Sequence, residues 1–360
     1  MKKLVLSISL ILSLTLAYAV KPHFSFFCEL QGKEFSELFA DSALINQLVK
    51  MKVEVRIGLH DFSPERTMTI QKLNQAGIPI VAWLLLPEEE GYWFNMYNGA
   101  KAEKRYADFK AWTAENNLKW EGIGIDLELD INDAKLAISH PWQLAWKAYK
   151  RLYDDQSIEE GKEVYQRLVS TMKNDGYTVE SYLIPFIYEE RAKKTTSAQK
   201  LMGIIDIKTD IEIPMLYTSA LNNPAIIPVY HQKDMPVALG STGGGVKIEG
   251  VELKAITWDN LERDILIASQ FTNEIHIFCL ETSVQQNFLT KIESIDFSQK
   301  TPDIQSEITK QQKINRAIGF IFVIFDHPFL LMVVFLAVIA LVSWGLYRLL
   351  RMIFRLLKRI

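Results

Sequence analysis

Residues 122–130 have the side-chain types and the spacing that an acid catalyst requires. They read Gly-Ile-Gly-Ile-Asp126-Leu-Glu128-Leu-Asp130, so an extended strand puts four large apolar side chains on one face and the glycines and acids on the other. Carboxyl groups held close together raise one another's pKa, which keeps one of them protonated near neutral pH. An isolated Asp-x-Glu more often caps a helix or pairs with a basic side chain. The two glycines on the acidic face favour a functional site.

Both ends of the chain predict a protein that is exported and attached to a membrane. Residues 1–19 have the lysines, apolar run and small-x-small triplet of a secretory signal peptide, with an uncleaved anchor as the alternative. Within a membrane segment expected at 317–347, an uncharged run at about 329–346 is long enough to span a bilayer. The basic tail at 348–360 places the C-terminus in the cytoplasm. We therefore expect a single-pass protein whose main body is extracytoplasmic and whose C-terminal helix contacts lipid.

The part of the chain between these ends predicts one large domain over 20–297 and a polar linker over 298–316. About 280 residues suffice for one large domain, and no Gly-, Ser- or Pro-rich stretch divides them. The formal net charge is only −3, from 40 basic and 43 acidic residues. This balance gives no indication of a nucleic-acid partner.

Apolar runs and helical spacings alternate along this domain in the manner of an α/β fold, the (β/α)8 TIM-like barrel. An open doubly wound sheet is the alternative, but no strand is followed by a Gly-rich turn of the nucleotide-binding type. The expected strands are 24–28, 53–59, 78–86, 122–130, 179–185, 211–216, 237–239 and 275–280. The expected helices are 35–51, 64–77, 102–116, 142–174, 191–202 and 260–272.

Active sites of such barrels lie at the carboxyl ends of the strands. Acids and aromatic side chains follow several of the expected strands. This combination suits carbohydrate, because sugar rings stack on aromatic faces while their hydroxyls form hydrogen bonds. For any single aromatic residue, a place in the core is an equal expectation. Besides Asp126 and Glu128, the candidate substrate-binding residues are Glu29, Trp83, Tyr92, Trp93, Asp130, Trp258 and Glu281.

The stretch Glu121-Gly-Ile-Gly-Ile-Asp126-Leu-Glu128 resembles the fourth-strand signature D-G-x-D-x-D-x-E of family 18 glycoside hydrolases, the chitinase-like barrels. The run Pro-Met-Leu-Tyr217 resembles their sixth-strand Met-x-Tyr segment, and the resemblance covers residues 23–283. It implies a retaining hydrolase of an amino-sugar glycan, without a cofactor, in which the substrate acetamido group is the internal nucleophile. It further implies that Glu128 is the general acid, that Asp126 assists the acetamido group, and that Tyr217 contacts this group or the intermediate.

Three positions depart from the family 18 pattern. Glu121 stands where the first Asp belongs and Gly124 where the second belongs, so the row of carboxylates behind Asp126 is interrupted. Cys279 stands near the eighth-strand position at which chitinases have a Trp beneath the sugar. An Asp-x-Glu on a barrel strand also resembles the lysozyme-like family 25 hydrolases, so the polymer stays open.

Cys28 and Cys279 fall on the first and eighth expected strands, which are neighbours in a closed barrel. In an exported protein they could form a disulfide. Two buried thiols are the alternative, because disulfides between directly paired strands are uncommon.

Three functions remain open at this point. The first is a membrane-anchored glycosidase acting on a polysaccharide or other glycan. The second is a catalytically inactive barrel that binds glycan or protein at the membrane. The third is a metal-dependent phosphodiesterase or isomerase with Glu29, Asp126, Glu128 and Asp130 as oxygen ligands. The sequence has no Cys/His spacing typical of zinc, and the first function, which is our main expectation, requires no metal.

Overall fold

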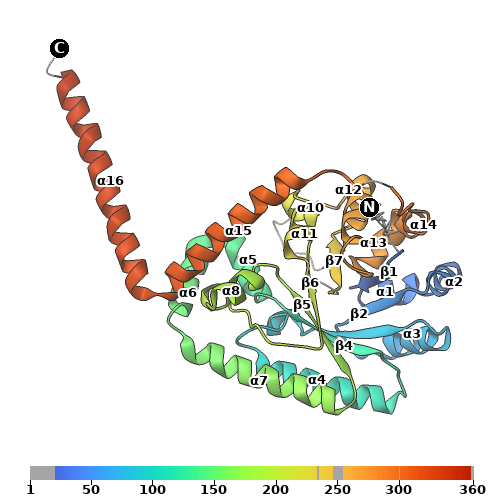
Figure 1. Cartoon of the computed structure of the whole chain (residues 1–360). Helices are drawn as coiled ribbons and strands as arrows, with labels where there is room; N and C mark the ends of the chain where they lie inside the picture. The colour runs from blue at the N-terminus through green and yellow to red at the C-terminus, as the bar shows by residue number, and fades with distance from the viewer. Residues whose placement is uncertain (1–20, 233–234, 246–253, 300, 358–360) are drawn as a thin grey trace, which may run out of the picture.

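Eight parallel strands form one sheet, in the order β6-β5-β4-β3-β2-β1-β8-β7 (Figure 1). The computed structural model describes residues 21–357 except 233–234, 246–253 and 300. The two outer strands meet where Met215 bridges Ala238 and the Leu216 N–H donates to the Ala238 carbonyl at 2.8 Å. The sheet is therefore a nearly closed barrel, as expected for a (β/α)8 fold. The strands are β1 (His23–Cys28), β2 (Glu54–Leu59), β3 (Ile80–Leu84), β4 (Gly122–Leu127), β5 (Thr178–Leu183), β6 (Ile211–Pro214), β7 (Val237–Gly240) and β8 (Glu274–Phe278).

Helices surround the barrel, and local capping residues fix where several of them begin. Ser63 Oγ accepts the Arg66 N–H at 3.2 Å, and Pro64 occupies the first turn of α3. Asp41 caps α2, which divides the single helix expected at 35–51 into two. The helices are α1 (Gly32–Leu38), α2 (Ser42–Met51), α3 (Pro64–Gln75), α4 (Gly99–Glu115), α5 (Ile131–Ser139), α6 (Pro141–Arg151), α7 (Asp155–Asn174), α8 (Ile187–Lys193), α9 (Ser197–Met202), α10 (Thr218–Leu221), α11 (Ile226–Tyr230), α12 (Trp258–Ala268), α13 (Leu280–Gln285), α14 (Phe288–Glu293), α15 (Gln305–Asp326) and α16 (Pro328–Leu357).

The fourth strand has the two faces that its sequence predicts. Ile123, Ile125 and Leu127 are buried in the apolar layer between the barrel and its helices. The alternate positions face the barrel interior, where a second apolar cluster contains Phe27, Trp83 and other aromatic residues. β4 therefore delivers its acidic side chains to the inside of the barrel.

A buried ion pair crosses the barrel interior. Arg56 on β2 donates to both carboxylate oxygens of Glu180 on β5, at 2.6 and 2.8 Å, and to Ser25 Oγ at 2.6 Å. The Tyr182 hydroxyl donates to Glu180 Oε1 at 2.6 Å. Removing one partner of such a pair would leave an uncompensated buried charge, which costs about 3–5 kcal/mol.

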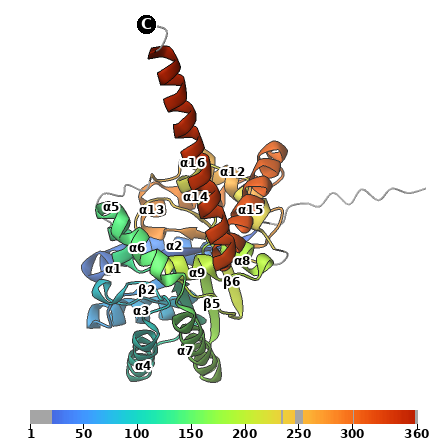
Figure 2. The same cartoon turned by 90° about the vertical axis from the view of Figure 1, so that its left-hand side faces the viewer.

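Helix α15 covers most of the polar linker expected at 298–316 and the start of the membrane segment expected at 317–347. Residues 317–326 are therefore corrected to a part of this helix. Its buried positions include Gln311 and Asn315, and the Asn223 side chain donates to Gln311 Oε1 at 2.7 Å. The helix packs along α8, α9 and α11, and Ser197 Oγ donates to the Phe322 carbonyl at 3.0 Å (Figure 2). The expected linker at 298–316 is therefore corrected over its helical part, because these polar side chains bond to the barrel.

Helix α16 follows α15 directly and projects away from the barrel (Figure 1). Among the described residues, it is the one helix long and apolar enough to cross a membrane, over Phe329–Ile353 with a mean hydropathy of 2.7. No residue of its most apolar window is buried against the protein. The signal peptide expected at 1–19 lies outside the described residues. The signal peptide and the topology remain predictions.

Candidate active site

The acid pair on β4 lies at the carboxyl end of the strand. Asp126 is buried in the barrel, and Glu128, just beyond the last strand residue, is half-buried. The loop after β3 extends this strand: the Phe94 N–H donates to the Asp126 carbonyl at 2.9 Å, and the Glu128 N–H donates to the Phe94 carbonyl at 3.2 Å. These bonds fix the backbone on both sides of the pair, so the two carboxyl groups are held in place.

Burial makes this pair retain a proton. It raises the pKa of Glu128 to about 7 and the pKa of Asp126 well above its usual range. The two carboxyl groups lie close enough to share a hydrogen bond, which further raises the pKa of Asp126. Trp83 lowers the pKa of Asp126, although neither Trp83 Nε1 nor Asp126 Oδ1 completes a hydrogen bond of normal geometry.

A cavity of about 280 Å³ opens at this end of the barrel. It contains both catalytic candidates on β4 and Tyr217, which follows β6. Burial and the neighbouring carboxylates raise the pKa of Tyr217, so its hydroxyl is a proton donor at neutral pH. The lining residues are Phe27, Glu29, Trp83, Trp93, Asp126, Glu128, Leu129, Ala134, Tyr182, Met215, Tyr217, Ser241, Gly244, Gly245 and Phe278.

Aromatic rings form the floor of the cavity. Phe27 lies edge-on to Trp83 and to Tyr182, with ring centroids 5.5 and 4.8 Å apart. Phe278 also belongs to this floor, and its ring centroid lies 6.4 Å from that of Trp83 and 5.8 Å from that of Tyr217. Sequence reasoning found Trp83 and Tyr217 but missed Phe27, Tyr182 and Phe278. The alternation of inward positions along β1 and β5 was the signal that could have identified the first two.

Glu29 brings a third carboxylate to the cavity from the loop after β1. Its Oε1 accepts a short hydrogen bond from the Tyr92 hydroxyl, and its charge raises the pKa of Asp126. Tyr92 has a positive φ of 63°, which turns the chain so that Trp93 also lines the cavity, 5.1 Å from the Tyr92 ring. Glu29 and Trp93 therefore line the cavity, whereas Tyr92 is buried beside it and bonds to Glu29. Substrate binding by these three residues remains a prediction.

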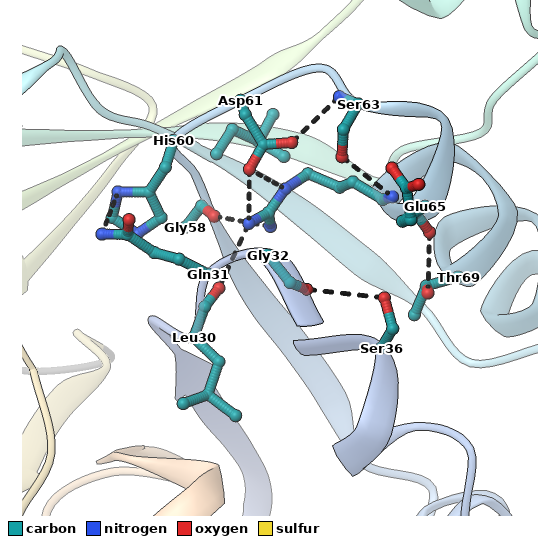
Figure 3. A network of polar contacts seen from close by, with 12 residues as sticks. Leu30, Gln31, Gly32, Ser36, Gly58, His60, Asp61, Ser63, Glu65 and Thr69 are labelled. Carbon is teal, nitrogen blue, oxygen red and sulfur yellow. Dashed lines mark hydrogen bonds and ion pairs between the residues drawn. The ribbon is translucent and has the colours of Figure 1, made fainter. Parts of the chain in front are cut away.

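A polar network holds the loop that carries Glu29 (Figure 3). His60 Nε2 lies 3.2 Å from the Glu29 carbonyl, and His60 Nδ1 lies 3.2 Å from Gln31 Nε2. Arg66 donates to the Leu30 carbonyl at 3.2 Å and to Asp61 Oδ2 at 3.2 Å. Burial and the nearby Arg66 charge lower the pKa of His60 to about 3, so this imidazole is neutral and serves to position the loop.

Three other predicted substrate-binding residues do not line the cavity. Asp130 caps α5 by accepting the Asn132 N–H at 2.8 Å. Trp258 begins α12 and packs on Phe288 in the outer helical layer, with ring centroids 5.5 Å apart. Glu281 is buried on α13 behind the loop at Gly244, and burial raises its pKa.

The two cysteines are both buried free thiols, so the disulfide considered above is absent. Burial raises the pKa of each. Cys279 Sγ donates to the Gly243 carbonyl at 2.9 Å, which accounts for its orientation. Within the described part of the chain, no group of three or more His, Cys, Asp or Glu side chains is placed to hold a metal ion.

No protein-family model matches the sequence, and no curated protein matches it either. Two kinds of solved structure are similar in fold. Gas2p from Saccharomyces cerevisiae, in complex with laminaritriose and laminaritetraose, is 10% identical with a TM-score of 0.38, covering 79% of this chain and 66% of its own. A Gas2p variant with laminaritetraose and laminaripentaose has a TM-score of 0.37 at 11% identity, covering 71% of this chain and 55% of its own. This chain thus spans about half to two thirds of the yeast protein's length.

The second kind is a sugar epimerase. D-allulose 3-epimerase from Methylomonas sp. is 9% identical with a TM-score of 0.40, covering 82% of this chain and 98% of its own. At these identities and TM-scores, neither likeness assigns a family or an activity to this chain. Membership of family 18 remains a prediction from the β4 and β6 motifs.

Proposed function

We propose that this chain is a membrane-anchored, extracytoplasmic glycoside hydrolase that acts on an amino-sugar-containing glycan with retention of configuration. The observation that carries the proposal is the placement of Asp126 and Glu128 side by side at the end of β4, in an aromatic cavity where burial raises the pKa of both carboxyl groups. Glycoside hydrolysis requires a carboxylic acid that is still protonated at the working pH and lies beside the leaving oxygen.

In the proposed reaction, Glu128 donates its proton to the glycosidic oxygen as the bond to the anomeric carbon breaks. The acetamido oxygen of the same sugar attacks the anomeric carbon, and Asp126 holds and polarises the acetamido group. Water then opens the cyclic intermediate, with the Glu128 carboxylate accepting the proton from that water. Tyr217 donates to the acetamido group or the intermediate, and the aromatic floor excludes water during the first step.

A panel of soluble oligosaccharides tests this proposal on the full chain in detergent. We expect hydrolysis of N-acetylamino-sugar oligomers, with the initial product in the same anomeric form as the substrate, as followed by proton NMR. Release of the inverted anomer would contradict retention. Hydrolysis of neutral glucans alone would contradict the acetamido mechanism while leaving the glycosidase assignment in place.

A catalytically inactive, glycan-binding barrel is the second candidate, because no side chain stands at position 124 behind Asp126. Isothermal titration with the same oligosaccharides separates the two. Binding without any product over long incubation, with equal affinity in the wild type and in Glu128→Gln, would favour the inactive barrel.

A further inference from the structure

The outer face of α6 is a row of exposed aromatic side chains. Trp142, Trp146 and Tyr149 lie on the helix, and Tyr153 follows it, at spacings of four, three and four residues. Their side chains are 87%, 59%, 45% and 52% exposed. Single exposed apolar residues are ordinary, but three at helical spacing with a fourth just after the helix indicate a contact surface. We call these four residues the α6 aromatic face.

The α6 aromatic face lies close to the point at which the chain leaves the barrel for α16. Helices α6 and α15 both pack on α9, and α15 continues directly into α16. Both views show α6 beside the junction of α15 and α16 (Figures 1 and 2). In the anchored topology, this junction at His327–Pro328 is where the chain enters the bilayer.

The charges around the α6 aromatic face suit a lipid surface. Helix α6 contains no acidic residue. Its Lys147 is paired with Asp133 at 2.6 Å, so Lys150 is the basic side chain that lies beside the aromatic face. Lys150 Nζ lies 5.3 Å from the centre of the Trp146 ring, so its aliphatic stem adds to the apolar surface while its ammonium can reach phosphate. Tryptophan, tyrosine and lysine together are the residues enriched where a protein meets the headgroup region.

A sugar chain is a less suitable occupant of this face. Trp146 and Tyr149 stack on each other at 5.5 Å and 18°, and Lys150 covers part of Trp146, so these two rings have fewer faces left for a sugar. Tyr149 and Tyr153 also lie edge to face, 5.4 Å apart. The cluster presents a broad apolar edge instead of a set of flat platforms.

We propose that the α6 aromatic face lies in the headgroup region of the bilayer that α16 enters. Helix α6 follows β4 through α5, so this docking holds the mouth of the barrel close to the membrane surface. The inference rests on the proposed anchoring by α16, and it does not depend on the reaction catalysed.

Single fluorescent labels on the full chain test this docking. Both native cysteines are buried with raised pKa values, so one introduced cysteine can be labelled selectively. The variants are Tyr149→Cys on α6, Leu341→Cys within α16, and Met68→Cys as an exposed control on α3, which lies across the barrel from α6 (Figure 1). Each is reconstituted into phosphatidylcholine–phosphatidylglycerol nanodiscs, and quenching by nitroxide-labelled lipid is measured.

We expect strong lipid quenching at positions 149 and 341 and none at position 68. Quenching at 341 without quenching at 149 would overturn the docking and leave the anchor intact. No quenching at 341 would overturn both. If the label at 149 were instead shielded from aqueous iodide by a soluble oligosaccharide in detergent, the face would be a glycan site. Slower amide hydrogen exchange over 141–153 in nanodiscs than in detergent supports the docking without altering the face, and equal exchange contradicts it.

Discussion

The Tyr182 hydroxyl occupies the space that a side chain on Gly124 would need. A Cβ on Gly124 would lie only 2.6 Å from Tyr182 Cζ and would overlap the hydroxyl oxygen. That hydroxyl donates to Glu180, which is paired with Arg56 across the barrel. The position at which the family 18 pattern has its second Asp is therefore filled by a phenol bound to a carboxylate from β5. Gly124 is glycine because Tyr182 packs against it.

Replacing Gly124 with alanine should destabilise the barrel. The added methyl group forces the Tyr182 ring to move, and overpacking of this kind costs about 1–3 kcal/mol. Denaturant unfolding followed by circular dichroism measures the loss. Tyr182→Leu in the Gly124→Ala background should recover part of it, because the two residues are in contact and their effects are not additive. If the loss of stability in the double variant equals the sum of the losses in Gly124→Ala and Tyr182→Leu, the two side chains do not compete for this space.

Replacing Glu128 with glutamine should lower kcat by about 10²–10⁴-fold, because an amide cannot supply the proton that the leaving oxygen needs. Glu121→Gln is the matched control, since Glu121 is an exposed acid just before the same strand and outside the cavity. We expect wild-type kcat for Glu121→Gln on any oligosaccharide that the wild type hydrolyses. Equal activity of the Glu128→Gln variant would remove Glu128 from the mechanism.

Activity should fall as the pH rises through about 7. Glu128 acts only while protonated, and its pKa is raised to about 7 by burial. The pH dependence of kcat/KM, which reports the free protein, should therefore show an alkaline limb near this value. If the Tyr217→Phe variant keeps the alkaline limb at the same pH, the limb reports the titration of the acid pair and not of the Tyr217 phenol.

The free energy of unfolding should also fall as the pH rises towards 7. The folded pKa of Glu128 lies above the ordinary value of 4.5, so the folded state holds a proton that the unfolded state has lost. The stabilisation is complete below about 4.5 and is lost as the pH rises towards 7. Denaturant unfolding of the wild type and of Glu128→Gln at several pH values checks this. Identical pH profiles would contradict the raised pKa.

Native protein prepared without reductant should contain two thiols that do not react. Cys28 and Cys279 are buried with raised pKa values, so a colourimetric thiol reagent should detect almost none in the folded chain and two after denaturation. Detection of none after denaturation would show that the two residues form a disulfide.

The alternation of apolar runs and helices was enough to predict the barrel, because parallel strands buried on both faces leave clear apolar runs. The two faces of β4 follow directly from Ile123, Ile125 and Leu127 alternating with Gly124 and Asp126. The acid pair could be predicted for the same reason. It depends on one strand, whose periodicity is visible without any knowledge of its neighbours.

Features that depend on two distant segments could not be predicted in this way. Alternation along β1 and β5 can place Phe27 and Tyr182 on the inward faces, but their contact across the barrel depends on how the two strands are brought together. The sequence around Gln311 and Asn315 is polar and was expected to be a linker. The two side chains are buried because α15 packs on α8, α9 and α11, where Asn223 bonds to Gln311. Trp258 follows β7 in the sequence, but its helix carries it to the outer layer.

The docking of α15 on the barrel limits how far the candidate site can move from the start of α16. A flexible segment of the same length as residues 298–316 would have a root-mean-square end-to-end distance of roughly 25 Å. This follows from the scaling of about 5–6 Å times the square root of the residue number. Helix α15 is held on the barrel by Gln311 and by the Ser197–Phe322 bond, so it does not have the variable length of a flexible segment. If α16 is the anchor, the mouth of the barrel is held at one fixed distance from the membrane. Encounter with substrate then becomes a search in two dimensions, governed by lateral diffusion within the membrane plane.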